Sequence, residues 1–129
     1  MKARHQLSIE ELEKAVRRFI KERDWDRYHS PKNIAMSIAI EAAELAEKFQ
    51  WLTTSGSKRV LNDPAQRKEI EDELADIATY VLDFSSKFGI DIARCVIRKL
   101  GDNAKKYPIR LVRGKHHKYT HYKGKRCRS

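Results

Sequence analysis

Apolar residues recur at helical spacing along most of the chain, and no stretch alternates between apolar and polar residues as a half-buried strand would. Start signals divide this pattern: Ser8 opens a capping box, and Ser30 and Asp63 are each followed by a proline suited to the first helical turn. Gly89 and Pro108 supply stop signals. Four helices are expected, over residues 9–22, 31–52, 64–87 and 92–105. Helices with such short connections predict an all-α, four-helix-bundle-like fold.

Two of the expected helices carry acidic residues on faces where a bundle normally buries aliphatic side chains. Each has a pair of carboxylates three residues apart, namely Glu41 with Glu44 and Glu73 with Asp76. Glu41 and Glu73 fall on the apolar stripes themselves. If the two stripes pack together, four carboxylates meet in a partly buried place, where ionised groups without partners cost several kcal/mol each. The pattern therefore predicts a cation between them, the alternative being two solvated acidic faces.

The residues available as ligands indicate the kind of cation. No histidine lies between His29 and His116, so the Glu-x-x-His ligands of di-iron bundles are absent. An all-oxygen site suits Mg²⁺, with Mn²⁺ as a second choice, and Mg²⁺ is commonly shared with substrate phosphates. The polar groups expected to meet such phosphates lie on one face of the fourth helix: Lys99, Asn103, Lys106 and, close by, Tyr107. A lysine-rich helix end also complements the helix dipole, which is the alternative interpretation.

The net charge of +10 comes from the C-terminal part of the chain. Residues 1–103 hold equal numbers of basic and acidic residues, whereas ten Lys or Arg and no acidic residue follow. A binding module that acts on nucleic acid or an acidic partner through this tail is one alternative to an enzyme, and a structural bundle is another. We do not expect nucleic-acid binding, because a pure binder has no need for carboxylates on apolar stripes. No segment has the length of a membrane span, so a cytoplasmic protein without membrane contact is expected.

The acidic motifs resemble the signature of the all-α nucleotide pyrophosphohydrolases, the MazG-like family. That signature is ExxE followed by ExxD, and the chain has EAAE at 41–44, 28 intervening residues and ELAD at 73–76. The stretches ERDW and FQW are similar to the dCTP pyrophosphatase branch of the family, and KKYP is similar to the usual C-terminal pattern of the family. The resemblance covers roughly residues 7–122, and residues 123–129 have no counterpart.

The resemblance implies a homodimer or homotetramer that hydrolyses a nucleoside triphosphate, with a leaning toward dCTP, to the monophosphate and pyrophosphate in nucleotide-pool cleaning. It assigns Mg²⁺ binding to Glu41, Glu44, Glu73 and Asp76. Among these, Glu41 is our candidate catalytic base, because its position on the apolar stripe places it more deeply.

Trp25, Trp51 and Tyr80 match the positions that line the base pocket in the dCTP pyrophosphatase branch, and core packing is the alternative for Trp25. His29 is expected either to face the same pocket or to lie in the turn before Ser30. Contacts to the phosphates remain assigned to the residues at the end of the fourth helix, Lys99, Asn103, Lys106 and Tyr107. A catalytic domain over residues 1–108 and a basic extension over 109–129 are expected.

Overall fold

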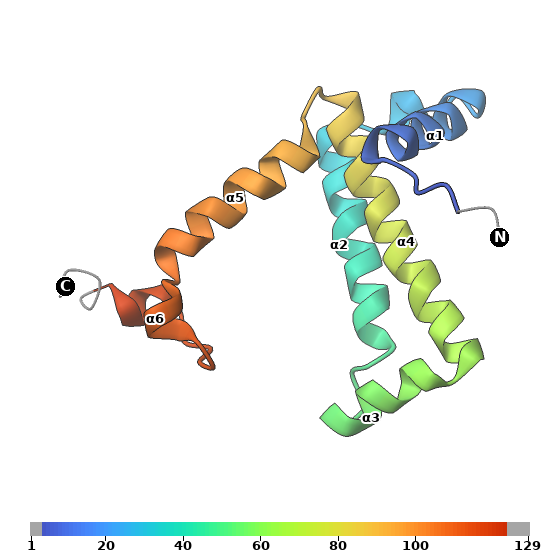
Figure 1. Cartoon of the computed structure of the whole chain (residues 1–129). Coiled ribbons are helices and arrows are strands. Elements are labelled where there is room, and N and C mark those ends of the chain that lie inside the picture. Colours follow the sequence, from blue (N-terminus) through green and yellow to red (C-terminus); the bar gives the residue numbers. More distant parts are fainter. Residues whose placement is uncertain (1–3, 124–129) are drawn as a thin grey trace. The chain divides into compact units, whose positions relative to one another are not determined.

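The computed structural model describes residues 4–123, and the regular elements in that part of the chain are all helical (Figure 1). This confirms the expected all-α class. The elements, with η marking a 3₁₀ helix, are α1 (Ile9–Glu22), η1 (Asp26–Tyr28), α2 (Pro31–Glu47), α3 (Thr54–Arg59), η2 (Val60–Asn62), α4 (Pro64–Lys87), α5 (Ile92–Lys106), α6 (Ile109–Val112) and η3 (Tyr119–Tyr122).

The four long helices begin where the sequence predicts. The Ser8 hydroxyl accepts a hydrogen bond from the Glu11 amide at 3.1 Å, and the Glu11 carboxylate accepts one from the Ser8 amide at 2.7 Å. Ser30 caps α2, Asp63 caps α4 and Asp91 caps α5, each with a side-chain oxygen that accepts a first-turn amide. These caps satisfy donors that a helix start leaves unpaired, so the start positions follow from local sequence.

Helix α2 ends earlier than expected, at Glu47 rather than at Leu52. The amides of Lys48 and Phe49 bond to carbonyls three residues back, at 3.2 and 3.0 Å, which tightens the last turn. Thr53 is then extended (φ −69°, ψ 165°) and caps α3, within the stretch that connects the expected helices 31–52 and 64–87. The prediction that α2 continues to Leu52 is wrong because the chain has to leave the helix before it can adopt this cap.

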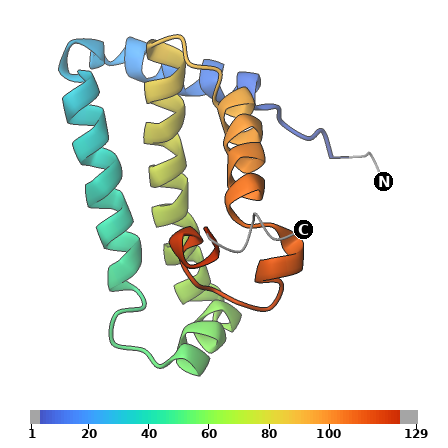
Figure 2. The same ribbon diagram turned by 90° about the vertical axis from the view of Figure 1, so that its left-hand side faces the viewer.

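The chain divides into two compact units, the first ending at Ile90 and the second beginning at Asp91. In the first unit α2 and α4 lie side by side, and α1 packs against α4 (Figures 1 and 2). The buried apolar residues of this unit are Ile20 from α1, Ile34 from α2 and Ile70 from α4. Because α2 and α4 pack along their lengths, the acidic pairs predicted from their sequences come onto facing surfaces.

The second unit contains α5, α6 and η3. Tyr122 is buried in it, with its ring 6.5 Å from that of Tyr107 and 5.0 Å from that of His121. The part of the expected basic extension that the structure describes, up to residue 123, therefore contains helical turns and a buried aromatic side chain. Residues 124–129 lie outside the described part. The domain boundary expected after residue 108 does not coincide with the division between the units and stays a prediction.

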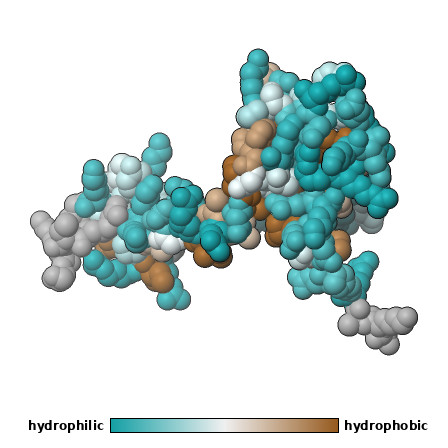
Figure 3. All heavy atoms as spheres, turned by 90° about the horizontal axis from the view of Figure 1, so that it is seen from above, coloured by the Kyte–Doolittle hydropathy of each residue, from teal (hydrophilic) through white to brown (hydrophobic). Residues whose placement is uncertain are grey.

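Large apolar side chains remain at the surface of several helices (Figure 3). Met36 and Ile40 on α2 and Leu74 on α4 are each more than half exposed, and so are Ile97 and Leu100 on α5. A single chain thus leaves part of its apolar faces uncovered. Among the described residues, no helix combines the length and apolar character needed to cross a membrane.

Candidate functional site

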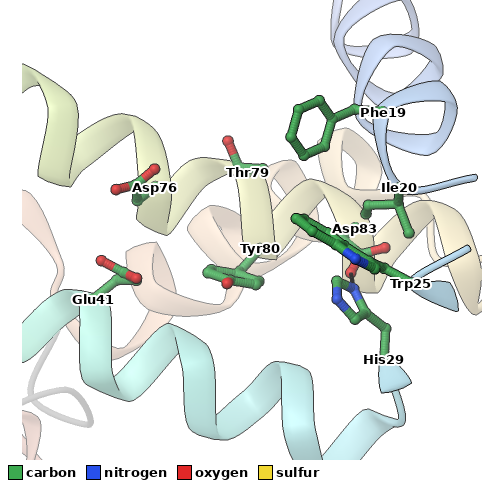
Figure 4. Close-up of a pocket in the computed structure, with 9 residues that line it drawn as sticks. All are labelled: Phe19, Ile20, Trp25, His29, Glu41, Asp76, Thr79, Tyr80 and Asp83. Carbon is green, nitrogen blue, oxygen red and sulfur yellow. Dashed lines mark hydrogen bonds and ion pairs between the residues drawn. The ribbon is translucent and has the colours of Figure 1, made fainter. Parts of the chain in front are cut away.

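An acidic cluster lies where α2 faces α4. One carboxylate oxygen from each of Glu41, Glu73 and Asp76 falls within 4.8 Å of the others. Figure 4 shows Glu41 on α2 and Asp76 on α4 pointing toward each other. Glu44 is outside this triplet but lies close enough to act on the pKa values of both glutamates. The structure therefore brings together the four carboxylates that the sequence singled out.

The pKa values of Glu41 and Glu73 are raised, in part by the neighbouring carboxylates. The pKa of Glu41 is raised to about 7, first by burial and then by a hydrogen bond with Glu44 and by repulsion from Glu44, Asp76 and Glu73. The pKa of Glu73 is raised by burial and by Glu44, against an opposing attraction from Lys48. Ionising all four groups together is costly without a counter-charge, so the cluster favours either a bound proton or a bound cation.

Two buried oxygens of this cluster have no hydrogen-bond partner among the described residues, Oε2 of Glu41 and Oε2 of Glu73. Buried carboxylate oxygens are normally paired, and an unpaired one calls for a ligand. Oxygen donors from three side chains within 4.8 Å form a set that a hard divalent cation accepts. The residues present therefore fit a divalent metal ion.

A pocket of about 200 Å³ adjoins the cluster in the first unit. Glu41 and Asp76 line one end, and Trp25 and His29 line the other, with Tyr80 between them (Figure 4). The remaining lining residues are Phe19, Ile20, Thr79 and Asp83. The pocket thus combines carboxylates at one end with aromatic walls at the other, and it contains three of the four residues predicted to meet a base.

The fourth predicted base-binding residue, Trp51, does not line this pocket. Its side chain is 88% exposed in the turn after α2. The prediction placed Trp51 on a helix two turns after Glu44, and this geometry is lost because α2 ends at Glu47. The assignment of Trp51 to the base stays a prediction.

The predicted phosphate-binding residues all belong to the second unit. Lys99 is exposed on α5, Asn103 and Lys106 are half-buried, and Tyr107 follows the helix as its C-terminal cap. The ammonium of Lys106 lies 4.8 Å from the centre of the Tyr119 ring, a cation–π contact. Their spacing on one face of α5 agrees with the sequence pattern, and their role toward phosphate stays a prediction.

A buried ionic network at the far end of the pocket was missed by the sequence reasoning. Asp83 is fully buried and accepts hydrogen bonds from Arg17 Nη1 at 2.7 Å and from His29 Nδ1 at 2.6 Å. Arg17 also donates to Asp26 at 2.7 Å. The sequence does contain an indication that Asp83 belongs to the site, because Asp83 lies seven residues after Asp76 and therefore on the same face of the helix. For Arg17 no comparable signal was present.

Comparison with known proteins places the chain in a family. The model of the MazG-like family matches residues 36–121, which include all four clustered carboxylates. The chain is 33% identical over 113 residues to dCTP pyrophosphatase 1 of Rattus norvegicus and 31% identical over 113 residues to that of Homo sapiens, in each case covering 88% of this chain and 66% of the relative. It therefore spans slightly less than two thirds of the length of these relatives.

A solved structure is also similar. A pyrophosphatase from Archaeoglobus fulgidus DSM 4304 superposes with a TM-score of 0.74 and 38% sequence identity, covering 84% of this chain and 99% of that protein. The family match, the relatives and this structure agree with the helical fold described above. The chain belongs to the MazG-like family.

Proposed function

We propose that the protein is a nucleoside triphosphate pyrophosphohydrolase that acts on deoxynucleoside triphosphates, dCTP above all, and releases the monophosphate and pyrophosphate. The observation that carries this proposal is the pocket itself, which has clustered carboxylates at one end and aromatic side chains at the other. The names of the similar proteins, dCTP pyrophosphatase 1 and a pyrophosphatase, support the same reaction. A role in nucleotide-pool cleaning, in the cytoplasm, goes with this proposal.

Glu41, Glu44, Glu73 and Asp76 would hold the metal, with Mg²⁺ the first choice and Mn²⁺ the second. A bound Mg²⁺ supplies positive charge that offsets charge building up on the phosphate oxygens. We assign to Glu41 the acceptance of the proton from the attacking water, because its Oε2 is buried and unpaired among the described residues and because Glu41, unlike Glu73, lines the pocket. Two helices hold these side chains, so their positions are set before a substrate arrives.

Trp25 and Tyr80 are the side chains suited to contact the base. The Trp25 ring is held edge-on against Phe19, with centroids 5.9 Å apart, and Tyr80 lies 6.4 Å from the His29 ring. Stacking of one base on an aromatic side chain contributes about 1–3 kcal/mol. An aromatic wall accepts any base, so selection among bases requires polar contacts in addition.

The proposal also assigns a role to residues of the second unit and includes a homo-oligomer. Lys99, Asn103, Lys106 and Tyr107 are assigned to the triphosphate because they share one face of α5 or its end. The exposed apolar side chains on α2, α4 and α5 support a homodimer or homotetramer. No observation favours nucleic acid as the partner.

The direct experiment incubates the protein with a panel of canonical and modified nucleoside triphosphates and Mg²⁺, and measures pyrophosphate and orthophosphate separately. Pyrophosphate without orthophosphate is the expected result, with dCTP the preferred substrate. Glu44→Gln and Asp76→Asn are expected to abolish turnover while circular dichroism keeps the helical spectrum of the wild type. Release of orthophosphate, or full activity in both variants, would contradict the proposal.

A further inference from the structure

We infer that Asp83 is a positioning residue for base selection: it orients His29 and holds a proton on Nδ1, so that Nε2 faces the pocket as a hydrogen-bond acceptor. This inference rests on the proposed function, because it assigns the base-reading contact within the proposed substrate pocket. It implies a preference for bases that carry an exocyclic amino group, such as cytosine, over bases that carry a keto group at that position.

The orientation of the His29 ring is set by a buried carboxylate. His29 Nδ1 lies 2.6 Å from Asp83 Oδ2, and Asp83 is 0% exposed. A carboxylate only accepts hydrogen bonds, so the hydrogen in this contact belongs to Nδ1. In neutral imidazole the other nitrogen then carries a lone pair. The Asp83 contact therefore makes Nε2 an acceptor.

The His29–Asp83 pair is held in place by further contacts from Arg17 and Lys87. Asp83 cannot turn away, because its other oxygen accepts from Arg17 at 2.7 Å. Lys87 donates to the backbone carbonyl of His29 at 2.6 Å and lies on α4, as Asp83 does. The ring and the backbone of His29 are thus both fixed to the helix that carries part of the acidic cluster.

His29 places a polar ring nitrogen in a pocket with aromatic walls. His29 lines the pocket together with Trp25 and Tyr80 (Figure 4). Both oxygens of Asp83 are occupied, and the Thr79 hydroxyl donates to a helix carbonyl at 2.8 Å. Within the described residues, Nε2 of His29 takes part in no hydrogen bond, so it is available to a ligand.

An acceptor at Nε2 of His29 is complementary to a base that donates a hydrogen bond. Cytosine and adenine carry an exocyclic amino group that donates, whereas thymine has a keto oxygen that accepts, and uracil has the same keto oxygen. An Nε2 lone pair pairs with the amino group and repels the keto oxygen. Discrimination between cytosine and uracil triphosphates therefore depends in part on which ring nitrogen of His29 holds the proton, beside the Tyr80 hydroxyl and the Trp25 indole N–H of the same pocket.

The test is Asp83→Asn. Arg17 has only donors, so the carbonyl oxygen of the introduced amide is expected to face Arg17 and its nitrogen to face His29, which then has to accept at Nδ1 and carry its hydrogen on Nε2. The matched control is Asp26→Asn, which makes the same chemical change at another partner of Arg17, one that also pairs with Lys87 at 3.2 Å, and keeps both residues of the His29–Asp83 contact.

Two readouts separate positioning from a general structural effect. The ratio of kcat/KM for dCTP to that for dUTP is expected to fall about tenfold or more in Asp83→Asn and to stay at the wild-type value in Asp26→Asn. The ¹⁵N spectrum of histidine-labelled protein at alkaline pH, with His29 assigned by its loss in His29→Gln, is expected to show Nδ1 protonated in the wild type and Nε2 protonated in Asp83→Asn.

Each outcome decides the inference. An unchanged dCTP to dUTP ratio in folded Asp83→Asn, or an equal loss in both variants, would overturn it. If Asp83→Asn does not fold, the wild-type ¹⁵N spectrum decides, since a proton on Nε2 instead of Nδ1 contradicts the assigned tautomer. If the wild type hydrolyses no triphosphate, the proposed function fails, and the two ¹⁵N spectra still decide whether Asp83 holds the proton on Nδ1.

Discussion

Replacing Glu41 by Gln is expected to stabilise the metal-free protein at alkaline pH while removing activity. In the wild type, Glu41 has to ionise in a half-buried cluster beside Glu44, Glu73 and Asp76, which raises its pKa from an ordinary value of 4.5 to about 7. Gln has nearly the same shape and no charge. The substitution therefore removes one of four like charges and leaves the helix packing in place.

The magnitude follows from this difference in pKa. A rise from 4.5 to about 7 corresponds to a cost of about 3 kcal/mol once the group is fully ionised in both the folded and the unfolded chain. Solvent at the edge of the pocket screens the repulsion, and we expect about 1–2 kcal/mol to be measured. For a chain of this length that raises the melting temperature by about 3–8 °C.

The direction of the Glu41 pKa shift determines the pH range over which the stability of the folded protein changes. Because the folded pKa is the higher one, the folded state retains the proton more strongly, and this contribution to stability is complete below pH 4.5. It is lost as the pH rises through about 7. The gain in Glu41→Gln is therefore expected to be largest at about pH 8 and to shrink toward about pH 5.

Thermal unfolding followed by circular dichroism measures this effect, in EDTA and in excess Mg²⁺. The control is Glu47→Gln, a matched change at an exposed position of the same helix, which is expected to leave the melting temperature unchanged. Added Mg²⁺ is expected to stabilise the wild type and Glu47→Gln more than Glu41→Gln. A Glu41→Gln protein that is no more stable than the wild type in EDTA at about pH 8 would refute the argument.

Three further outcomes are expected. Trp25→Ala is expected to lower kcat/KM for dCTP about tenfold or more through lost stacking, measured by pyrophosphate release, and an unchanged value would remove Trp25 from the base site. Removing residues 124–129 is expected to leave most of the catalytic activity in place, and a truncated protein that is folded but inactive would assign the function to the tail. A truncation that begins at His121 is a poorer test, because it also deletes the buried Tyr122. Light scattering at micromolar concentration is expected to give the mass of a dimer or tetramer, reduced by Ile40→Glu, and a monomer mass for the wild type would contradict the proposed assembly.

The sequence alone was sufficient for features that depend on neighbours a few residues apart. The capping box at Ser8 and the caps at Ser30, Asp63 and Asp91 are satisfied within one helical turn, so the helix starts could be predicted. The acidic pairs could be predicted for the same reason, because a spacing of three residues decides which helical face a side chain takes.

Features that depend on distant segments required the tertiary structure. Asp83 meets His29 across 54 positions of the chain and Arg17 across 66, and only the packing of α4 against neighbouring elements brings them together. The early end of α2, which leaves Trp51 exposed, follows from the cap of α3 and not from the apolar spacing, which continues past Glu47. The spacing could place four carboxylates on two faces, but the pKa of Glu41 depends on how deeply the facing helices bury it, and burial is a property of the folded chain.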